Sequence, residues 1–353
     1  MVKLLILTDF EELSLLEVNE LVGVKGEKVG SGILEIEVSK EKLLELCSRG
    51  QSFKRVLLKL DEVSDWNSVK FSGVDWESYF WKEASFKIDF SGVRGNENRI
   101  EIGREIGNRI FSLVEKESGF KPEINFKKPE MVVFVCFDGK KYFLGIDLIG
   151  YDLTKRDYRV FVNSASFKGD LGYYLVRQSG FVKGEKLVVG FVKDGVTLIE
   201  AGLFDGELVV NQKFSFERLP VFKDLEFDTL LKSKKENNIS GFDESMMNIR
   251  ASKKNAQIAK VSVGVNKFSL DELDVKFSDG ELDRLIFQIT KKDEDKLNEI
   301  YYQADYVLRQ KGVLLLLGRE NWDLSISDKF KLVSSEVIKK GTSGYKIWVL
   351  GKK

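Results

Sequence analysis

The chain has 353 residues, of which 43% are hydrophobic and 32% charged, so it can bury a sizeable core and form more than one domain. Its 56 basic and 56 acidic side chains give a formal net charge of +0, so any site for a polyanion must be a local patch. Histidine is absent, which argues against His-based hydrolases and His-based zinc sites, and no metal is expected.

The start of the sequence and its apolar runs predict a cytoplasmic protein without a membrane span. The opening MVKLLILTDFEEL turns acidic within a few residues, unlike a signal peptide, and no apolar run is long enough to cross a bilayer. Cys47 and Cys136 lie in apolar surroundings, which favours buried free thiols in a reducing compartment.

Residues 1–65 alternate strand-like and helix-like patterns. Strands are expected at 2–8, 32–39 and 53–63, and amphipathic helices at 10–23 and 40–50. This β-α-β-α-β order over a short length predicts a ferredoxin-like α+β domain.

Residues 66–150 form a second predicted α+β unit. Its helix places apolar side chains at helical spacing and stops at Gly119, and Asp138-Gly139 predicts the turn of a hairpin. The expected elements are a helix at 99–119 and strands at 85–93, 123–126, 131–139 and 141–150. Residues 151–165 read as a basic connector.

From residue 166 to 353 the rhythm changes to short apolar strands alternating with helices, which indicates a doubly wound, mostly parallel sheet. Residues 207–236 read as an insertion after the second helix. The expected helices are 171–180, 195–204, 246–261 and 293–312, and the expected strands are 185–190, 239–244, 261–265, 282–289 and 312–318, followed by a closing hairpin.

The stretch GFVKDGVTLIEAG, residues 190–202, stands between a strand and a helix, where a glycine-rich loop can present backbone N–H groups to a ligand. Lys193 occupies the position of a close-approach glycine, and Val189 stands where an acid would be useful. From the residues alone, this is either a remnant of a ligand site or a plain strand-to-helix turn.

Several segments together resemble a known family. DWESYFWKEASFKIDF, IGREIGNRI and NFKKPEMVVFVCFDGKKYFLGIDLIG resemble a THUMP domain, and the units that follow, with FSFERLP in the insertion, resemble the Rossmann-like methyltransferase domain of THUMP-containing RNA guanosine N2-methyltransferases. The pattern is similar to archaeal tRNA enzymes that modify an acceptor-stem guanosine and to their bacterial ribosomal-RNA counterparts. The resemblance covers nearly the whole chain.

The resemblance implies S-adenosylmethionine as cofactor where such an enzyme is active. The family motif D-P-F-C-G-S-G-T aligns with residues 189–196, VGFVKDGV, where Gly190 and Gly195 are the cofactor-binding candidates. Asp243 corresponds to the acid that binds the ribose hydroxyls, and Asn266 stands in place of the acid that contacts adenine. Without the resemblance, Asp243 reads equally well as a cap of the following helix.

The family motif that performs the chemistry is N-P-P-Y or D-P-P-Y. Here the aligned stretch is Gln288-Ile289-Thr290-Lys291, in which Gln288 is the catalytic candidate, the paired prolines are absent and a lysine replaces the stacking aromatic ring. Apolar side chains near the cofactor cleft, namely Phe191, Phe242 and Phe287, form either a repacked core or a groove for a protein partner.

Basic residues in the THUMP-like region and the connector are candidates for RNA phosphates, because phosphate contacts need only cationic donors at a surface. The alternative is an ordinary solvated charged face. The candidates are Arg94, Lys127, Lys128, Lys155, Arg156 and Arg159.

The resemblance and its departures lead to one main hypothesis: an RNA-binding protein, with tRNA as the expected RNA, whose methyltransferase domain has lapsed and serves as a scaffold or partner subunit. The alternative is an active, divergent S-adenosylmethionine-dependent tRNA guanine-N2-methyltransferase that uses Asp243 and Gln288. A third class, a protein-interaction subunit without an RNA role, predicts no salt-sensitive RNA affinity.

Overall fold

In the computed structural model, two sets of elements pack separately. The N-terminal unit comprises residues 1–153 together with 211–225, and the C-terminal unit comprises residues 154–210 and the chain from 238 to its end. The structure describes residues 1–163, 166–225, 238–289, 292–340 and 343–353.

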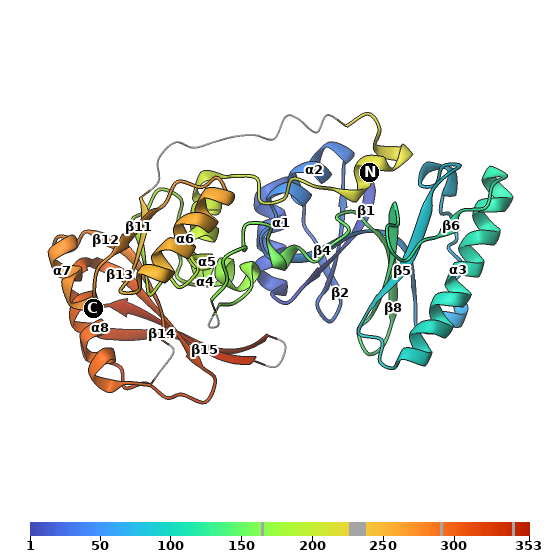
Figure 1. Cartoon of the computed structure of the whole chain (residues 1–353). Coiled ribbons are helices and arrows are strands. Elements are labelled where there is room, and N and C mark those ends of the chain that lie inside the picture. The colour runs from blue at the N-terminus through green and yellow to red at the C-terminus, as the bar shows by residue number, and fades with distance from the viewer. Residues whose placement is uncertain (164–165, 226–237, 290–291, 341–342) are drawn as a thin grey trace. The chain divides into compact units, whose positions relative to one another are not determined.

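The N-terminal unit is built on one eight-stranded sheet of order β2-β3-β1-β4-β8-β7-β5-β6, with helices packed on it (Figure 1). Its elements are β1 (Val2–Thr8), α1 (Glu11–Val22), β2 (Glu27–Gly30), β3 (Ile33–Val38), α2 (Lys40–Arg49), β4 (Phe53–Val63), β5 (Ser85–Ser91), α3 (Asn96–Ser118), β6 (Glu123–Ile124), β7 (Met131–Phe137) and β8 (Tyr142–Asp147). The first six elements follow the ferredoxin-like order β-α-β-β-α-β, in which β2 is a strand that the sequence pattern did not predict.

Strand β1 shows how alternation builds both faces of this sheet. Leu4 and Ile6 join the large core that also contains buried residues of α1, α2 and α3, whereas Leu5 and Leu7 join a smaller cluster of buried residues. Successive side chains of a strand point to opposite faces, so a strand buried on both sides is apolar throughout.

The two predicted N-terminal domains share this sheet because β4 pairs antiparallel with β8. Gly145 permits the close approach, since a Cβ atom there would lie 2.7 Å from the Leu58 carbonyl oxygen. Buried Asp147 accepts a bond from Arg55 across the junction, and its Oδ1 accepts the backbone N–H groups of Ile149 and Gly150 at 3.1 and 3.0 Å.

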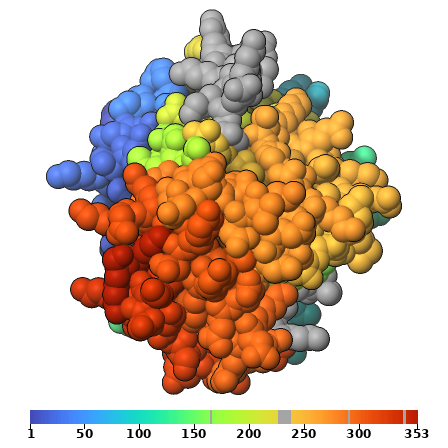
Figure 2. Space-filling view, turned by 90° about the vertical axis from the view of Figure 1, so that its left-hand side faces the viewer, coloured from blue at the N-terminus to red at the C-terminus, as the bar shows by residue number. Residues whose placement is uncertain are grey.

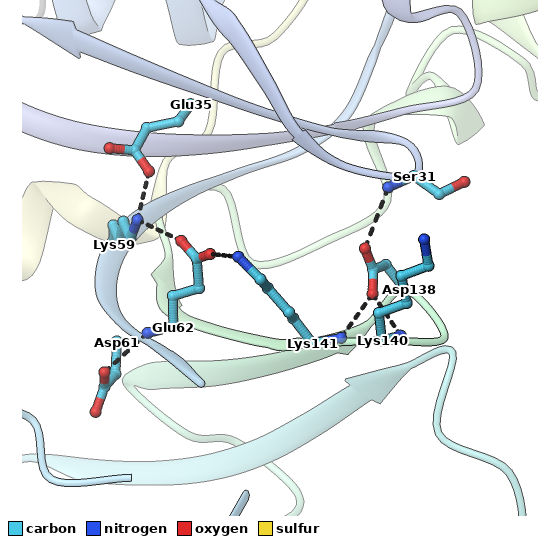
Figure 3. Close-up of polar contacts among 8 residues, drawn as sticks. All are labelled: Ser31, Glu35, Lys59, Asp61, Glu62, Asp138, Lys140 and Lys141. Atoms are coloured by element: carbon cyan, nitrogen blue, oxygen red, sulfur yellow. Dashed lines mark hydrogen bonds and ion pairs between the residues drawn. The ribbon is translucent and has the colours of Figure 1, made fainter. Parts of the chain in front are cut away.

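A network of charged side chains lies beside this junction (Figure 3). Lys59 of β4 donates to Glu35 of β3 and, at 2.9 Å, to Glu62, which in turn accepts a bond from Lys141 at 2.8 Å. Desolvation opposes the charge on Lys59, but Glu35 and Glu62 outweigh it and leave the pKa of Lys59 raised. Desolvation likewise opposes ionisation of Glu62, but Lys141 and Lys59 leave its pKa lowered.

We expect Lys59→Met to lower the free energy of unfolding by about 1 kcal/mol at neutral pH, because Glu35 and Glu62 lose their shared cation. The raised pKa of Lys59 means that its contribution is complete below the unfolded value and lost as pH rises through the folded value. The lowered pKa of Glu62 means that its contribution is lost as pH falls through the folded value. Urea denaturation at about pH 3.5, 7 and 11 should therefore show the largest difference at pH 7.

Exposed Lys140 provides the control, since Lys140→Met should change stability by less than about 0.5 kcal/mol. A difference between wild type and Lys59→Met that does not change with pH would contradict the electrostatic explanation.

The inserted segment belongs partly to the N-terminal unit, whereas the sequence pattern placed it in the C-terminal domain. Phe216, Leu219 and Phe222 are buried in the N-terminal core, and the Phe216 N–H donates to the Leu148 carbonyl at 3.1 Å. Asn211 donates from its backbone to the Ser48 carbonyl at 3.0 Å. Phe216, Leu219 and Phe222 are spaced three residues apart, so their side chains can face the same core.

The C-terminal unit has a seven-stranded sheet of order β11-β10-β9-β12-β13-β15-β14. The strands from β11 to β13 run parallel, and β15 and β14 add an antiparallel edge, which confirms the predicted mostly parallel α/β fold. Its elements are α4 (Gly169–Gln178), β9 (Leu187–Gly190), α5 (Val196–Gly206), β10 (Ile239–Asp243), α6 (Met246–Ile258), β11 (Gly264–Lys267), α7 (Leu273–Lys276), β12 (Leu282–Gln288), α8 (Glu294–Val307), β13 (Leu308–Arg319), β14 (Phe330–Lys340) and β15 (Ser343–Lys352). Figure 2 shows the orange and red segments of this unit over much of the visible face.

One predicted boundary is wrong. The helix expected over 293–312 ends at Val307, and β13 begins at Leu308, which pairs with Leu282 of β12. Lys311 has a φ of 66°, a left-handed conformation that interrupts a helix, and the register of β13 shifts beside it.

Candidate functional site

The loop after β9 lies at the carboxyl ends of the parallel strands, where ligands bind in open α/β sheets. Three of its residues are left-handed: Phe191 and Lys193 with φ of 56° and Gly195 with φ of 85°. Asn255 of α6 holds the loop by donating to the Asp194 carbonyl at 2.8 Å. The backbone at Lys193 thus keeps a conformation typical of glycine although the side chain is a lysine.

Gly190 ends β9 against an aromatic cluster. A Cβ atom at this position would lie 2.0 Å from Cε1 of Phe287, whose ring lies 5.3 Å from that of Phe191 and 6.1 Å from that of Phe242. Phe242 stacks on Phe268 at 4.3 Å, and none of the three candidate rings is more than 9% exposed. Of the two interpretations of these aromatic residues, the structure supports the repacked core.

Asp243 ends β10, and donors of the protein surround its carboxylate. Oδ1 accepts from the Ser245 N–H at 2.9 Å and from Asn248 at 3.0 Å, while Oδ2 accepts from Asn248 at 3.0 Å and from the Lys193 N–H at 3.2 Å. Asn163 in turn donates to the Asn248 side-chain oxygen at 2.9 Å. Three donor groups of the protein, two backbone N–H groups and the Asn248 amide, thus already bind both oxygens of a carboxylate that offers about four lone-pair positions.

A cavity of about 300 Å³ opens beside this carboxylate, and Phe191, Lys193, Asp243, Gln288 and Lys296 are among its lining residues. Burial lowers the pKa of Lys193; Asp243 counteracts this, and the nearby charge of Lys296 adds to it. The Lys296 ammonium lies 4.2 Å from the centre of the Phe191 ring. The lining of the cavity thus combines two lysines and an aromatic ring with three carboxylates, those of Asp243, Glu244 and Asp293.

The structure separates the two remaining candidates of this domain. Gln288 ends β12 and lines both this cavity and a second one of about 660 Å³ that also includes Ser166, Arg319 and Tyr345. Asn266 lies on β11 beside Phe242, exposed and outside the lining of the smaller cavity. Two residues of the N-P-P-Y alignment, Thr290 and Lys291, lie outside the described residues.

Arg156, predicted from the sequence to contact RNA, is buried instead. Its guanidinium donates to Glu200 of α5 at 2.7 Å from Nε and 3.0 Å from Nη2, and the Tyr158 hydroxyl donates to the same carboxylate at 2.7 Å. The side chains of Arg156 and Glu200 are 0% exposed. Arg156 therefore holds the connector against α5 and is not available to a phosphate.

The other predicted RNA contacts fall into two groups. In the N-terminal unit, Arg94 is exposed after the last residue of β5, whereas Lys127 and Lys128 are exposed after β6, which pairs only with the first two residues of β5. Lys155 is exposed in the C-terminal unit, whereas Arg159 donates to the Ser166 hydroxyl at 2.7 Å and is half-buried.

Asn248 and Lys296 belong to the site but were missed from the sequence. Asn248 lies in the first turn of α6, five residues beyond Asp243, and this short spacing is the signal that could have identified it. Lys296 is in the first turn of α8 and also lines the cavity. Its sequence neighbourhood carries no comparable signal, because α8 reaches the site only through the pairing of the parallel strands.

The described residues contain neither a candidate metal site nor a candidate membrane-spanning helix. In the described part of the chain, no cluster of three Cys, Asp or Glu side chains is placed to hold a metal ion. Among the same residues, no helix combines the length and apolar character that crossing a bilayer requires.

Comparison with known proteins places two domains in the chain. Residues 70–147 match the THUMP domain, and residues 156–323 match the family described as RMKL-like, methyltransferase domain. Ribosomal RNA large subunit methyltransferase K/L of Aliivibrio fischeri is 27% identical over 258 residues, which are 68% of this chain and 37% of that protein. The Vibrio parahaemolyticus protein of the same name is 24% identical over 261 residues, again 68% of this chain and 36% of that one. The chain thus spans little more than a third of these relatives.

Solved structures agree with the fold. TrmN from Thermus thermophilus superposes with a TM-score of 0.71 over 100% of both chains at 17% identity. SMU.472, a putative methyltransferase complexed with SAH, gives a TM-score of 0.74 over 99% of this chain and 97% of that chain, also at 17% identity. The predicted combination is confirmed at the level of domains: the chain joins a THUMP domain to an RMKL-like methyltransferase domain.

Proposed function

We propose that this protein binds RNA, with tRNA as the expected type, and that its methyltransferase domain has lost methyl transfer and serves as a scaffold or partner subunit. One observation carries the proposal: three donors of the protein itself already bind the two oxygens of Asp243. A ribose hydroxyl donating to this carboxylate would have to compete with them.

Two cations among the cavity residues oppose the binding of S-adenosylmethionine, although the carboxylates of Asp243, Glu244 and Asp293 line the same cavity. Lys193 brings a half-buried ammonium group beside Asp243, and Lys296 adds a second cation. The cofactor carries a positive sulfonium, and like charges at close range in a poorly solvated site repel each other. The sequence adds that no proline pair and no aromatic residue follow Gln288 in its motif.

An active, divergent guanine-N2-methyltransferase is the second candidate, and the position of Gln288 favours it. The residue lies at the end of β12 and lines both cavities, the one of about 300 Å³ beside Asp243 and the one of about 660 Å³. A side-chain carbonyl there provides a hydrogen-bond acceptor for an amino group. The longer side chain shifts this acceptor relative to the Asn or Asp of the family motif.

The RNA component of the proposal is supported by the THUMP domain and by exposed cations of the N-terminal unit, namely Arg94 after β5 and Lys127 and Lys128 after β6. Cationic side chains bind phosphates without sequence information, and such contacts persist when chemistry is lost. Because the chain has no net charge, we expect the affinity to come from local cations of this kind.

Isothermal titration of the full chain with S-adenosylmethionine, and separately with S-adenosylhomocysteine, tests the proposal. We expect no saturable heat with either ligand. Titration of Lys193→Gly removes the ammonium group and tests whether it is the barrier for the sulfonium.

Saturable micromolar binding by the wild type that Asp243→Ala abolishes would overturn the lapsed-domain proposal, and transfer of a labelled methyl group to RNA would establish the alternative. Asp279→Ala is the matched control, because this exposed carboxylate of the same unit lies outside both cavities. RNA affinity is measured in parallel against salt concentration, since its absence would reject the RNA component independently of the cofactor.

A further inference from the structure

An apolar groove is lined by residues of α3, β5 and β6 in the N-terminal unit, and Figure 1 shows these elements. The cavity has a volume of about 540 Å³ and is lined on the strand side by Phe86, Ile88, Phe90 and Ile124. Its rim carries apolar side chains in contact with solvent: Ile100 is 61% exposed, Ile124 43% and Phe126 76%. Contiguous exposed apolar surface of this kind marks a binding site more often than a single exposed side chain does.

Charges on α3 are sorted by face. The helix residues that line the groove are Asn96, Arg99, Ile100, Gly103 and Arg104, which include two arginines and no acid. The helix acids Glu97, Glu101 and Glu105 are absent from this lining. The Arg99 Nε donates to the Val93 carbonyl at 2.8 Å, which fixes the base of its side chain beside the groove.

Phe126 is held in place by a local turn. The side-chain oxygen of Asn125 accepts the N–H groups of Lys127 and Lys128 at 3.1 and 3.0 Å, and the Asn125 N–H donates to the Phe86 carbonyl at 3.0 Å. This anchoring presents the Phe126 ring at the groove with two exposed lysines directly after it.

We propose that this groove is a subsite for one unstacked base of single-stranded RNA, which stacks on Phe126 while Arg104 and Lys127 contact the flanking phosphates. The proposal rests on the RNA binding proposed above and specifies where a base, rather than a phosphate, is held. An aromatic ring beside cationic side chains is the arrangement with which proteins bind single strands, because every base has a face that stacks.

The charge of the groove decides between RNA and another occupant. Two arginines line it, two lysines follow Phe126, and its lining contains no carboxylate, so the surroundings complement a polyanion. A protein segment would cover the apolar residues equally well. A protein segment does not in general carry the uniform negative charge that a groove with cations and no carboxylates complements. A second copy of the chain would bring the same four cations against themselves.

The test compares binding of a fluorescent single-stranded oligoribonucleotide and of an RNA duplex by the full-length protein. Phe126→Ala should weaken single-strand binding about 5- to 150-fold and duplex binding much less, because only a splayed base can stack. The salt dependence should not change, since no phosphate contact is lost. Lys127→Ala should instead reduce the slope of log affinity against log salt by about 0.7.

Matched variants make the result interpretable. Phe126→Trp keeps a stacking ring and should retain binding, with quenching of the added tryptophan by RNA. Leu16→Ala removes an apolar side chain that is 47% exposed on α1 of the same unit and should leave the affinity unchanged.

Three outcomes would overturn the inference. If Lys127→Ala weakens binding and Phe126→Ala does not, the RNA-binding function stands and the stacking subsite is rejected. If the wild type shows no salt-dependent affinity for RNA, the proposed function and the subsite are rejected together. If Phe126→Ala converts a dimer seen by analytical ultracentrifugation into a monomer, the groove is a protein interface.

Discussion

Replacing Glu200 with glutamine should lower the free energy of unfolding by about 3–5 kcal/mol, because the buried guanidinium of Arg156 would lose its counter-charge. Burial opposes the charge on Arg156, but Glu200 outweighs this and raises the pKa of Arg156 above its ordinary value, so the guanidinium is charged at neutral pH. The Tyr158 hydroxyl would also lose a charged acceptor. Guanidinium denaturation of the full chain measures the loss, and hydrogen exchange in α5 shows that the C-terminal unit is affected.

The neighbouring residue supplies the control. Lys155 precedes Arg156 in the chain but is exposed, so Lys155→Ala should change stability by less than about 0.5 kcal/mol. Replacing both members of the pair, as in Arg156→Met with Glu200→Leu, should recover much of the loss, because no charge is then left buried and unpaired. Equal destabilisation by the Lys155 and Glu200 substitutions would contradict the buried-pair explanation.

Gly190→Ala should lower the free energy of unfolding by about 3 kcal/mol, although the substitution adds only one methyl group. The new Cβ atom would lie 2.0 Å from Cε1 and 2.3 Å from Cδ1 of Phe287. The ring of Phe287 is 0% exposed and packs against Phe191 and Phe242, so it has no empty space into which to move. Denaturation of the full chain measures the change.

A double mutant tests the stated cause. Phe287→Leu shortens the side chain that the added methyl group meets. In a protein that carries Phe287→Leu, Gly190→Ala should therefore lower the free energy of unfolding by at least about 1 kcal/mol less than it does in the wild type. Gly107→Ala in α3 is the control, because its Cβ atom would be 3.8 Å from the nearest neighbours and alanine is the better helix former. Additive effects of the Gly190 and Phe287 substitutions would show that the clash is not the source of the loss.

The loop after β9, which follows Gly190, also bears on the proposed loss of methyl transfer. Phe191 and Lys193 keep left-handed backbone conformations that glycine adopts more easily, and their side chains line the cavity beside Asp243. Strain of this kind persists only where surrounding structure imposes it. Here the bonds from Asn255 to the Asp194 carbonyl and from the Lys193 N–H to Asp243 provide that restraint.

Local pattern was enough to predict most elements of this protein. The spacing of Ile102, Ile106, Ile110 and Val114 identified α3, and all four side chains are buried. Strands β9, β10 and β12 were predicted from short apolar runs, and their parallel order followed from the helices between them. These features depend on neighbours within one turn or one strand, so the sequence determines them directly. Strand β2 escaped prediction because its four residues are only half-buried or exposed.

Tertiary structure decided the features that depend on distant partners. Arg156 looks like a surface cation until Glu200, 44 positions later, places it in the core. Residues 211–225 follow the C-terminal unit's second helix in sequence, yet their aromatic side chains pack in the N-terminal core. Asp243 was predicted to bind a ligand or to cap the following helix. In the structure its carboxylate also accepts a hydrogen bond from the N–H of Lys193, which lies 50 positions earlier in the chain. The burial of a side chain and the hydrogen bonds that it accepts depend on residues that are distant in sequence and that only folding brings together. A residue's type and its spacing from its sequence neighbours therefore could not predict them.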